Sequence, residues 1–305
     1  DFNEDELAAM IAALDPDQPL QSYADAEVGE YYEERVPPVD VMCAGPKAVP
    51  LLEAALAQAE SAGNRARQTL LARMLAVLGS NAGVEVLVAE IPNRLSGDTL
   101  PARDAKVRHA GRNPPNQGAA PEAANLLYCL GMAGDARALP VWERVVDLLE
   151  GATEAEILDP VKAWYYYVSY LAYGAERLGD PAAIPLLTRL HSYPPVHNQR
   201  VSSGFQSDHL PERLAYLELL IGRALARCGS PEGYLVLINY LDDVRALLTE
   251  HAHAELAAIT GEDFGKSPST WSAWLEREGD DLAPVPWTGP TEPVAAWEKE
   301  ILIEP

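Results

Sequence analysis

One short pattern recurs along this chain and limits what it can fold into: a helical run that ends in glycine, a capping residue, and a new amphipathic run. It reads AGPKAVPLLEAAL, LGSNAGVEVLVAEI, AGDARALPVWERVV, LGDPAAIPLLTRL and CGSPEGYLVLINYL. The anchoring glycines are Gly45, Gly79, Gly134, Gly179 and Gly229, with a fainter sixth at Gly261. Their successive spacings of 34, 55, 45, 50 and 32 residues leave room for two helices between neighbouring glycines.

Each part of this pattern has a physical reason. Glycine adopts the left-handed conformation that ends a helix at little cost. The residues expected to cap the next helix, by accepting hydrogen bonds from its free amides, are Ser80, Asp135, Asp180 and Ser230. In RALPVWERVVDLL the apolar residues recur at three- and four-residue spacing, so one stripe of this helix is buried. A single helix pair cannot bury such a stripe, whereas stacked pairs can.

The sequence therefore predicts an all-α fold, a HEAT/armadillo-like right-handed α-solenoid of about five helix pairs with a C-terminal cap. The glycine–Asp/Ser–Pro opening and its first-turn proline resemble HEAT-like repeats of the bilin-lyase type. An irregular helical bundle is the alternative. The expected pairs are 46–61 with 64–78, 80–91 with 121–133, 136–150 with 160–178, 181–191 with 212–228, and 230–241 with 243–260. A short helix capped by Ser267 then closes the last apolar face with Trp271 and Trp274.

Charge divides the chain into three parts. Residues 1–45 hold 12 acidic residues against Arg35 alone, which predicts an acidic N-terminal segment or linker with one helix. Residues 46–275 are nearly balanced in charge and form the expected solenoid. Residues 276–305 hold 8 acidic and 2 basic residues, and we expect an extended acidic tail there. The chain does not begin with methionine, so we also expect it to be a piece of a longer protein.

Composition excludes several classes of function. The net charge of −23 repels a polyanion, so we expect no nucleic-acid binding, and the lack of a long apolar run predicts no membrane span. The three cysteines (Cys43, Cys129 and Cys228) form no CxxC pair; as free buried thiols they favour a reducing compartment, hence a cytoplasmic location. No nucleotide, serine-hydrolase or zinc-protease motif occurs. His197 and His209 with Asp208 are close in sequence, but loop spacing alone does not define a metal site, so we predict none.

Two inserts, at about 92–120 and 192–211, account for the long periods, and each lies between the two helices of its own repeat. The first has a net charge of +3 and includes Arg108 and Arg112. In a solenoid such turns project from one edge, and loops this long are usually functional or disordered. The inserts therefore predict a joint rim that grips a ligand or partner, with two solvated insertions as the alternative.

The second helix of the third repeat, VKAWYYYVSYLAYGAERLG, carries an aromatic face. Tyr166, Tyr170 and Tyr173 share one side of it, where they can bind a ligand or pack between repeats. Arg223 and Arg227, four residues apart on the next such helix, can bind a carboxylate or phosphate, or else pair with Glu218 or Glu232.

Three segments resemble the C-terminal helical region appended to certain bacterial FAD-dependent oxidoreductases: ANLLYCLGMAGDARALPVWERVVDLL, YGAERLGDPAAIPLLTRLHSYPP, and the run from AYLELLIGRALARCGSPEGYLVLINYL to GEDFG. The resemblance covers roughly residues 45–287. In such proteins the flavin belongs to a separate N-terminal part. The resemblance therefore implies no cofactor in this chain, with FAD bound by a part outside it, and no catalytic residue.

Together these features predict a non-catalytic binding or scaffold module whose partner is a protein or a neighbouring domain, or else a small-molecule or saccharide ligand. The expected binding residues are Tyr166, Tyr170, Tyr173, Arg108, Arg112, His197, Arg200, His209, Arg223 and Arg227. One alternative is a ligand-processing lyase or hydrolase with its active site between the inserts and the second helices, and an insert histidine as general base. Another is oligomerisation through the inserts.

Overall fold

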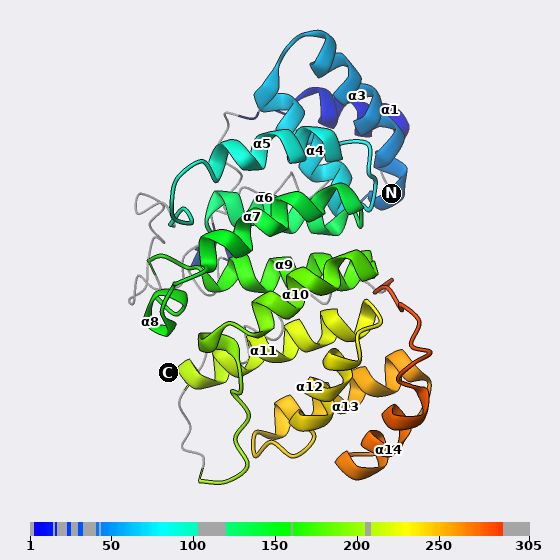
Figure 1. Cartoon of the computed structure of the whole chain (residues 1–305). Coiled ribbons are helices and arrows are strands. Elements are labelled where there is room, and N and C mark those ends of the chain that lie inside the picture. The colour runs from blue at the N-terminus through cyan, green and yellow to red at the C-terminus, as the bar shows by residue number, and fades with distance from the viewer. Residues whose placement is uncertain are drawn as a thin grey trace. The chain divides into compact units, whose positions relative to one another are not determined.

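The chain is mainly α-helical, as the sequence predicts (Figure 1). The computed structural model describes residues 3–14, 16, 23–25, 30–32, 41–42, 44–102, 120–159, 161–204 and 209–288. It divides into two units, Asp1–Gly174 and Ala175–Pro305. In the described part of the chain, no helix combines the length and apolar character needed to cross a membrane.

The first unit begins with helix α1 (Glu4–Ala12), in the stretch where the sequence predicts a helix, and Val41 and Met42 are helical as well. Asn3 caps it, because its Oδ1 accepts the amide of Glu6 at 2.9 Å while Glu6 Oε2 accepts the amide of Asn3 at 3.1 Å. Two short antiparallel strands follow, β1 (Tyr23–Asp25) and β2 (Glu30–Tyr32). The sequence analysis expected only a linker here and missed this pairing.

The rest of the first unit consists of helices that pack on their neighbours. They are η1 (Gly45–Ala48), α3 (Val49–Ser61), α4 (Arg65–Val77), α5 (Val84–Arg94), α6 (Glu122–Met132), η2 (Ala136–Ala138), α7 (Leu139–Leu149), α8 (Glu154–Ile157) and the start of α9 (Tyr165–Leu178). Helix α4 packs on α3, α5 and α6, and α5 packs on α6 and α7 (Figure 1). Helices α4 and α5 thus each contact both the next helix and the next but one. The short helix α8 was not predicted; Thr153 and Glu156 form a capping box at its start.

The second unit repeats this arrangement. After the end of α9 it contains η3 (Pro181–Ala183), α10 (Ile184–His191), η4 (Pro194–Val196), α11 (His209–Arg227), α12 (Pro231–Tyr240), α13 (Ala246–Thr260) and α14 (Pro268–Glu278). Helix α11 packs on α10, α12 and α13, and α12 packs on α13 and α14. Ser267 caps α14 as expected, and the Trp271 ring packs on Phe264 and Trp274, with centroids 4.8 and 6.1 Å apart.

A tight 3₁₀ turn precedes each of the helices α3, α7 and α10, where the sequence predicted an α-helical first turn. In each, proline is the second residue of the α-helix, at Pro50, Pro140 and Pro185. Proline has no amide to bond the carbonyl four residues earlier. The residue before it bonds three residues back instead, as when the Leu139 amide reaches the Ala136 carbonyl, which is the 3₁₀ pattern.

The glycine anchors adopt the predicted left-handed conformation, with φ from 56° at Gly179 to 87° at Gly229. Two of the four expected caps are confirmed, since the side chains of Asp135 and Asp180 accept amides at the helix starts. The other two were wrong. Ser230 is the N-cap of α12 by position, but its side chain makes no capping bond, and α5 begins after Gly83 rather than at Ser80.

Close backbone packing joins α6 to α9 inside the first unit. A Cβ atom built on Gly131 would lie 2.7 Å from the Cα of Gly174, and one on Gly174 would lie 2.6 Å from the Trp142 ring. The Trp142 side chain is fully buried. Glycine at both positions therefore allows the two helices to approach this closely.

Cys129 and Cys228 are free and buried, as the sequence predicts, and burial raises the pKa of both thiols. Cys43 lies outside the described residues.

Candidate functional site

The second insert begins where α10 ends, at His191. Pro194 and Pro195 start the short turn η4, since proline fits the first turn of a helix, where an amide has no partner. This turn brings His197 back to His191: their ring centroids lie 4.9 Å apart, and the rings cross at 71°. Val196 between them is fully buried and fixes the turn. One tight turn thus places two imidazoles side by side.

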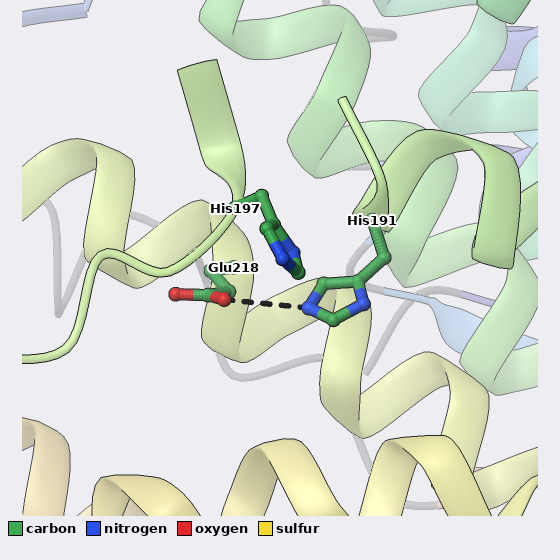
Figure 2. Close-up of side chains that lie close together, drawn as sticks. All are labelled: His191, His197 and Glu218. Carbon is green, nitrogen blue, oxygen red and sulfur yellow. Dashed lines mark hydrogen bonds and ion pairs between the residues drawn. The ribbon is translucent and has the colours of Figure 1, made fainter. Parts of the chain in front are cut away.

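Glu218 of α11 lies beside these rings and binds the chain that follows them. Its Oε1 accepts the amide of Asn198 at 2.8 Å, and its Oε2 accepts the amide of Gln199 at 2.7 Å and the hydroxyl of Tyr240 at 2.6 Å. The Nε2 atom of His191 lies 3.3 Å from Oε1 (Figure 2). Asn198 has a left-handed φ of 59°, which asparagine tolerates better than most residues. Two successive amides therefore face one carboxylate.

His191 lies between two carboxylates. Its Nδ1 is 2.7 Å from Oε1 of Glu232, whose other oxygen accepts the hydroxyl of Thr188 at 2.8 Å. Burial alone would lower the pKa of His191, but hydrogen bonds to Glu218 and Glu232 raise it above its ordinary value. For Glu218, burial alone would raise the pKa, but the hydrogen bonds from His191, Tyr240 and the backbone lower it. An imidazolium–carboxylate pair is favoured.

His197 completes the cluster. Its Nδ1 is buried and has no hydrogen-bond partner in the described part of the chain. One ligand atom from each of His191, His197 and Glu218 lies within 4.8 Å of the others (Figure 2). Two imidazoles and a carboxylate at this spacing are suited to binding a metal ion or to moving a proton.

Sequence analysis named only His197 of these three as a binding residue. His191 and Glu218 were missed, although Glu218 is the only charged residue within the run LAYLELLIG of α11. A single carboxylate in such an apolar helix must find hydrogen-bond donors outside the helix. Its isolated position in the sequence was therefore the feature that could have identified Glu218.

The described end of the insert bonds to the turn between α12 and α13. Arg200, a predicted binding residue, lies 3.3 Å from Asp242 in an exposed ion pair. The amide of Val201 donates to Oδ2 of Asp243 at 2.9 Å, and its carbonyl accepts the amide of Val244 at 2.9 Å. Residues 197–201 therefore contact both α11 and the turn before α13.

Arg223 and Arg227 of α11 do not pair with Glu218 or Glu232, the partners considered from sequence. Arg223 lies 3.1 Å from Oε2 of Glu176 and 3.9 Å from Glu255, and Arg227 forms an ion pair with Glu255. All four side chains are largely buried. Burial raises the pKa of Glu176 to about 7, against the opposing effect of Arg223. The reason for the difference in partners is that α9 and α13 present their carboxylates to this face of α11.

The tail segment 283–288 contains no helix or strand and lies against this cluster. Arg227 and Val285 bond twice: the Val285 amide donates to the Arg227 carbonyl at 2.8 Å, and Nη1 of Arg227 donates to the Val285 carbonyl at 3.0 Å. The Trp287 amide donates to the Glu176 carbonyl at 2.8 Å, and its ring lies 4.6 Å from the Arg227 guanidinium. The remainder of the tail, 289–305, lies outside the described residues.

The predicted tyrosines lie on α9 in the first unit. The Tyr166 ring is 5.5 Å from that of Tyr170, which is 5.0 Å from Tyr128 of α6. Tyr165 also meets Tyr166 edge to face, at 5.9 Å. These side chains and Tyr173 are half-buried. The rings thus pack on one another while part of each remains accessible.

The other predicted binding residues have no described side chain. Arg108 and Arg112 lie in 103–119, outside the described residues. His209 is the first residue of α11, so this helix begins three residues before the predicted position.

Comparison of the chain with protein-family models, curated proteins and solved structures gives no match.

Proposed function

We propose that this chain is a non-catalytic helical-repeat module that binds an extended segment of a partner protein on the tyrosine-bearing surface of α6 and α9. In this proposal the helices form a right-handed HEAT-like solenoid, and α4, α6, α9, α11 and α13 are the second helices of its repeats. Helices α4 and α5 in the first unit, and α11 and α12 in the second, each contact the next helix and the next but one, which supports such an arrangement.

The observation that carries the proposal is the set of touching tyrosine rings. Tyr128, Tyr166 and Tyr170 come from two different helices, and their rings follow one another at 5.0 and 5.5 Å. Half-buried tyrosines supply flat contact area with few rotatable bonds, and each keeps a polar tip. Such residues are enriched among those that dominate binding energy at protein interfaces.

An extended peptide is the partner that the chain's own chemistry favours. In the second unit, the segment 283–288 already bonds to the backbone carbonyls of Arg227 in α11 and Glu176 in α9, and the Trp287 ring lies over the Arg227 guanidinium. Ring stacking and main-chain hydrogen bonds of the same kind could bind an extended terminal segment of a partner domain. A saccharide or flat small molecule is the other ligand that tyrosine rings accept, and the experiment below separates them.

The test is a selection of peptides from a random displayed library against the full chain. We expect the combined Tyr166→Ala and Tyr170→Ala change to weaken the selected peptides by at least about 30-fold, roughly 2 kcal/mol, with little change in melting temperature. The matched control replaces two exposed apolar side chains of the second unit, Leu235 and Val244, with alanine and leaves binding unchanged.

Two results would reject this function. If the selected peptides bind the tyrosine variant as tightly as the wild type, the rings are not the binding surface. If binding and melting temperature fall together, the rings belong to the core. Binding of oligosaccharides but not peptides to the same tyrosines would keep the surface and replace the partner class.

A ligand-processing lyase or hydrolase is the second candidate, and one observation favours it. His197, an insert histidine with an unpartnered buried nitrogen among the described residues, lies beside Glu218 of a second helix. However, both oxygens of Glu218 already accept two donors each, which leaves no free lone pair for a general base. The binding module is therefore the better proposal.

The origin of the module belongs to the same proposal. As the C-terminal part of a larger FAD-dependent oxidoreductase-like protein, it would itself hold no flavin, and its partner segment would come from the neighbouring catalytic part. The test is to express the longer protein, separate residues 1–305 from the rest by proteolysis, and measure FAD in each part by mass spectrometry. FAD found only in the part outside residues 1–305 would support this origin.

A further inference from the structure

We propose that His191, His197 and Glu218 bind a divalent transition-metal ion of the Zn²⁺ class, which joins the second insert to α10 and α11. This site is independent of the tyrosine surface and goes beyond the binding function proposed above. It rests on the distances between the three side chains, on the groups behind them, and on the buried nitrogen of His197.

The first observation is a distance. The Nε2 atom of His191 and Oε1 of Glu218 are 3.3 Å apart, which is long for a hydrogen bond between charged groups. Two ligands that each lie about 2.0–2.1 Å from a tetrahedral zinc ion are separated by about 3.3 Å. The ion therefore fits between these two atoms without moving either. The ion replaces the Nε2 proton of His191, so the lone pair of Oε1 that accepted this proton binds the ion while the other keeps the amide of Asn198, at 2.8 Å.

The second observation is the set of groups behind the ligands. The Nδ1 atom of His191 is 2.7 Å from Glu232, an arrangement that fixes the ring and leaves Nε2 as the metal ligand. Glu218 is held by the hydroxyl of Tyr240 and by two backbone amides. Metal-binding histidines and carboxylates in proteins are supported in this way. Both ligands are thus oriented before an ion arrives.

The third observation is His197. Its buried Nδ1 has no hydrogen-bond partner in the described part of the chain, and burying a polar atom without one is costly. Figure 2 shows its ring beside the contact between His191 and Glu218. Its ligand atom lies within 4.8 Å of theirs, so a small rotation of the ring brings it to an ion at the shared centre. Metal binding through Nδ1 would give this nitrogen a partner.

The donor set selects the class of ion. Two imidazoles and one carboxylate suit Zn²⁺ and its neighbours among the transition metals, whereas Mg²⁺ and Ca²⁺ prefer oxygen ligands only. Three protein ligands leave a fourth position for water or a ligand. The ion would lie where the insert returns to the helices, and its main consequence would be to stabilise residues 191–201 in the folded conformation.

The experiment is a calorimetric titration of the full chain, stripped with a chelator, with ZnCl₂. We expect one equivalent to bind, and the change His197→Ala to lower the affinity at least about 100-fold, since even outer-shell changes cost about 10- to 100-fold. His197→Ala removes none of the four donors to Glu218, so the variant should fold, which circular dichroism of the metal-free protein checks. Glu232→Gln should weaken binding about 10- to 100-fold.

The matched control is His253→Ala. His253 also lies against a carboxylate, 2.9 Å from Asp263, but belongs to no group of three candidate metal ligands among the described residues, so its loss should leave the affinity unchanged. Co²⁺ supplies a second readout, since a site with nitrogen ligands and fewer than six donors gives a visible absorption band that His197→Ala should abolish.

Zn²⁺ that binds wild type and His197→Ala with equal affinity would overturn the proposal, because the acidic surface would then explain the binding. The lack of a tight first equivalent in the wild type would overturn it too. An excess of Mg²⁺ that displaces the ion would also do so, since it would identify an oxygen-only site.

Discussion

The buried charge cluster around Glu176 gives a pH-dependent prediction that can be worked from the structure. Burial raises the pKa of Glu176 from an ordinary 4.5 to about 7 in the folded chain. Its facing groups are Arg223 and Arg227, which favour its charged form, and Glu255, which opposes it. The Arg223 charge also acts on the neighbouring His251, where burial lowers the pKa to about 4.

The sign follows from proton binding in the two states. Between the unfolded and folded pKa values of Glu176, the folded chain holds a proton that the unfolded chain has lost. The stability from this group is therefore fully present below about pH 4.5 and is lost as the pH rises through about 7. A separation of about 2.5 pH units corresponds to about 3 kcal/mol.

The perturbation is Glu176→Gln, which keeps the shape of the side chain and removes its titration. The difference in unfolding free energy between the two proteins therefore reports the titration of Glu176 together with its coupling to Glu255. We expect the wild type to lose up to about 3 kcal/mol relative to this variant between about pH 4 and about pH 8. Urea denaturation at a series of pH values, with amide hydrogen exchange in α11 as a local probe, measures it.

A matched variant tests the direction as well as the size. His251 has a lowered pKa, so its contribution is present above about pH 6.5 and is lost as the pH falls towards about 4. The difference between wild type and His251→Asn should therefore change with pH in the opposite direction to that for Glu176→Gln. A difference between wild type and Glu176→Gln that is constant over this range, or that rises with pH, would refute the reasoning.

Two further predictions concern packing and the tail. Gly131→Ala places a methyl group against the backbone of Gly174 and should destabilise the first unit by about 1–3 kcal/mol, whereas Gly97→Ala, whose new Cβ meets nothing closer than 3.8 Å, should change the thermal melting temperature little. Trp287→Ala removes the ring that lies 4.6 Å from the Arg227 guanidinium, an interaction of about 1 kcal/mol, and should speed amide exchange in 283–288 while exchange in α12 stays unchanged. Equal melting temperatures of Gly131→Ala and Gly97→Ala would contradict the packing prediction. Unchanged amide exchange in 283–288 would contradict the prediction for Trp287→Ala.

The helices were predictable because local rules determine where each begins and ends. Gly134, Asp135 and Pro140 end one helix and start the next through their own conformations and hydrogen bonds, whatever lies around them. The rules did not predict the 3₁₀ turn that precedes Pro140 in place of an α-helical first turn. This turn depends on the hydrogen bond that proline, which has no amide hydrogen, cannot make, rather than on a residue preference. The strands β1 and β2 pair three residues each, too few for an alternating pattern to be visible.

The partners of the charged residues were not predictable. Arg223 and Glu218 lie five residues apart on α11, and a helix places residues at this spacing on different faces. Which carboxylate meets Arg223 depends on the neighbouring helices, and those supply Glu176 and Glu255 from distant parts of the sequence. Sequence spacing therefore identified the charged side chains but not their contacts.

The unusual composition of the second insert follows from Glu218. A buried carboxylate costs several kcal/mol unless hydrogen bonds satisfy it, and the amides of α11 around it are already used within the helix. Donors must come from outside the helix, and Asn198, Gln199, His191 and Tyr240 provide them. An insert that must turn two consecutive amides and a histidine towards one carboxylate cannot continue as a helix, and the prolines and Asn198 make that turn. The polar stretch after α10 is thus the counterpart of a single charge in the next helix.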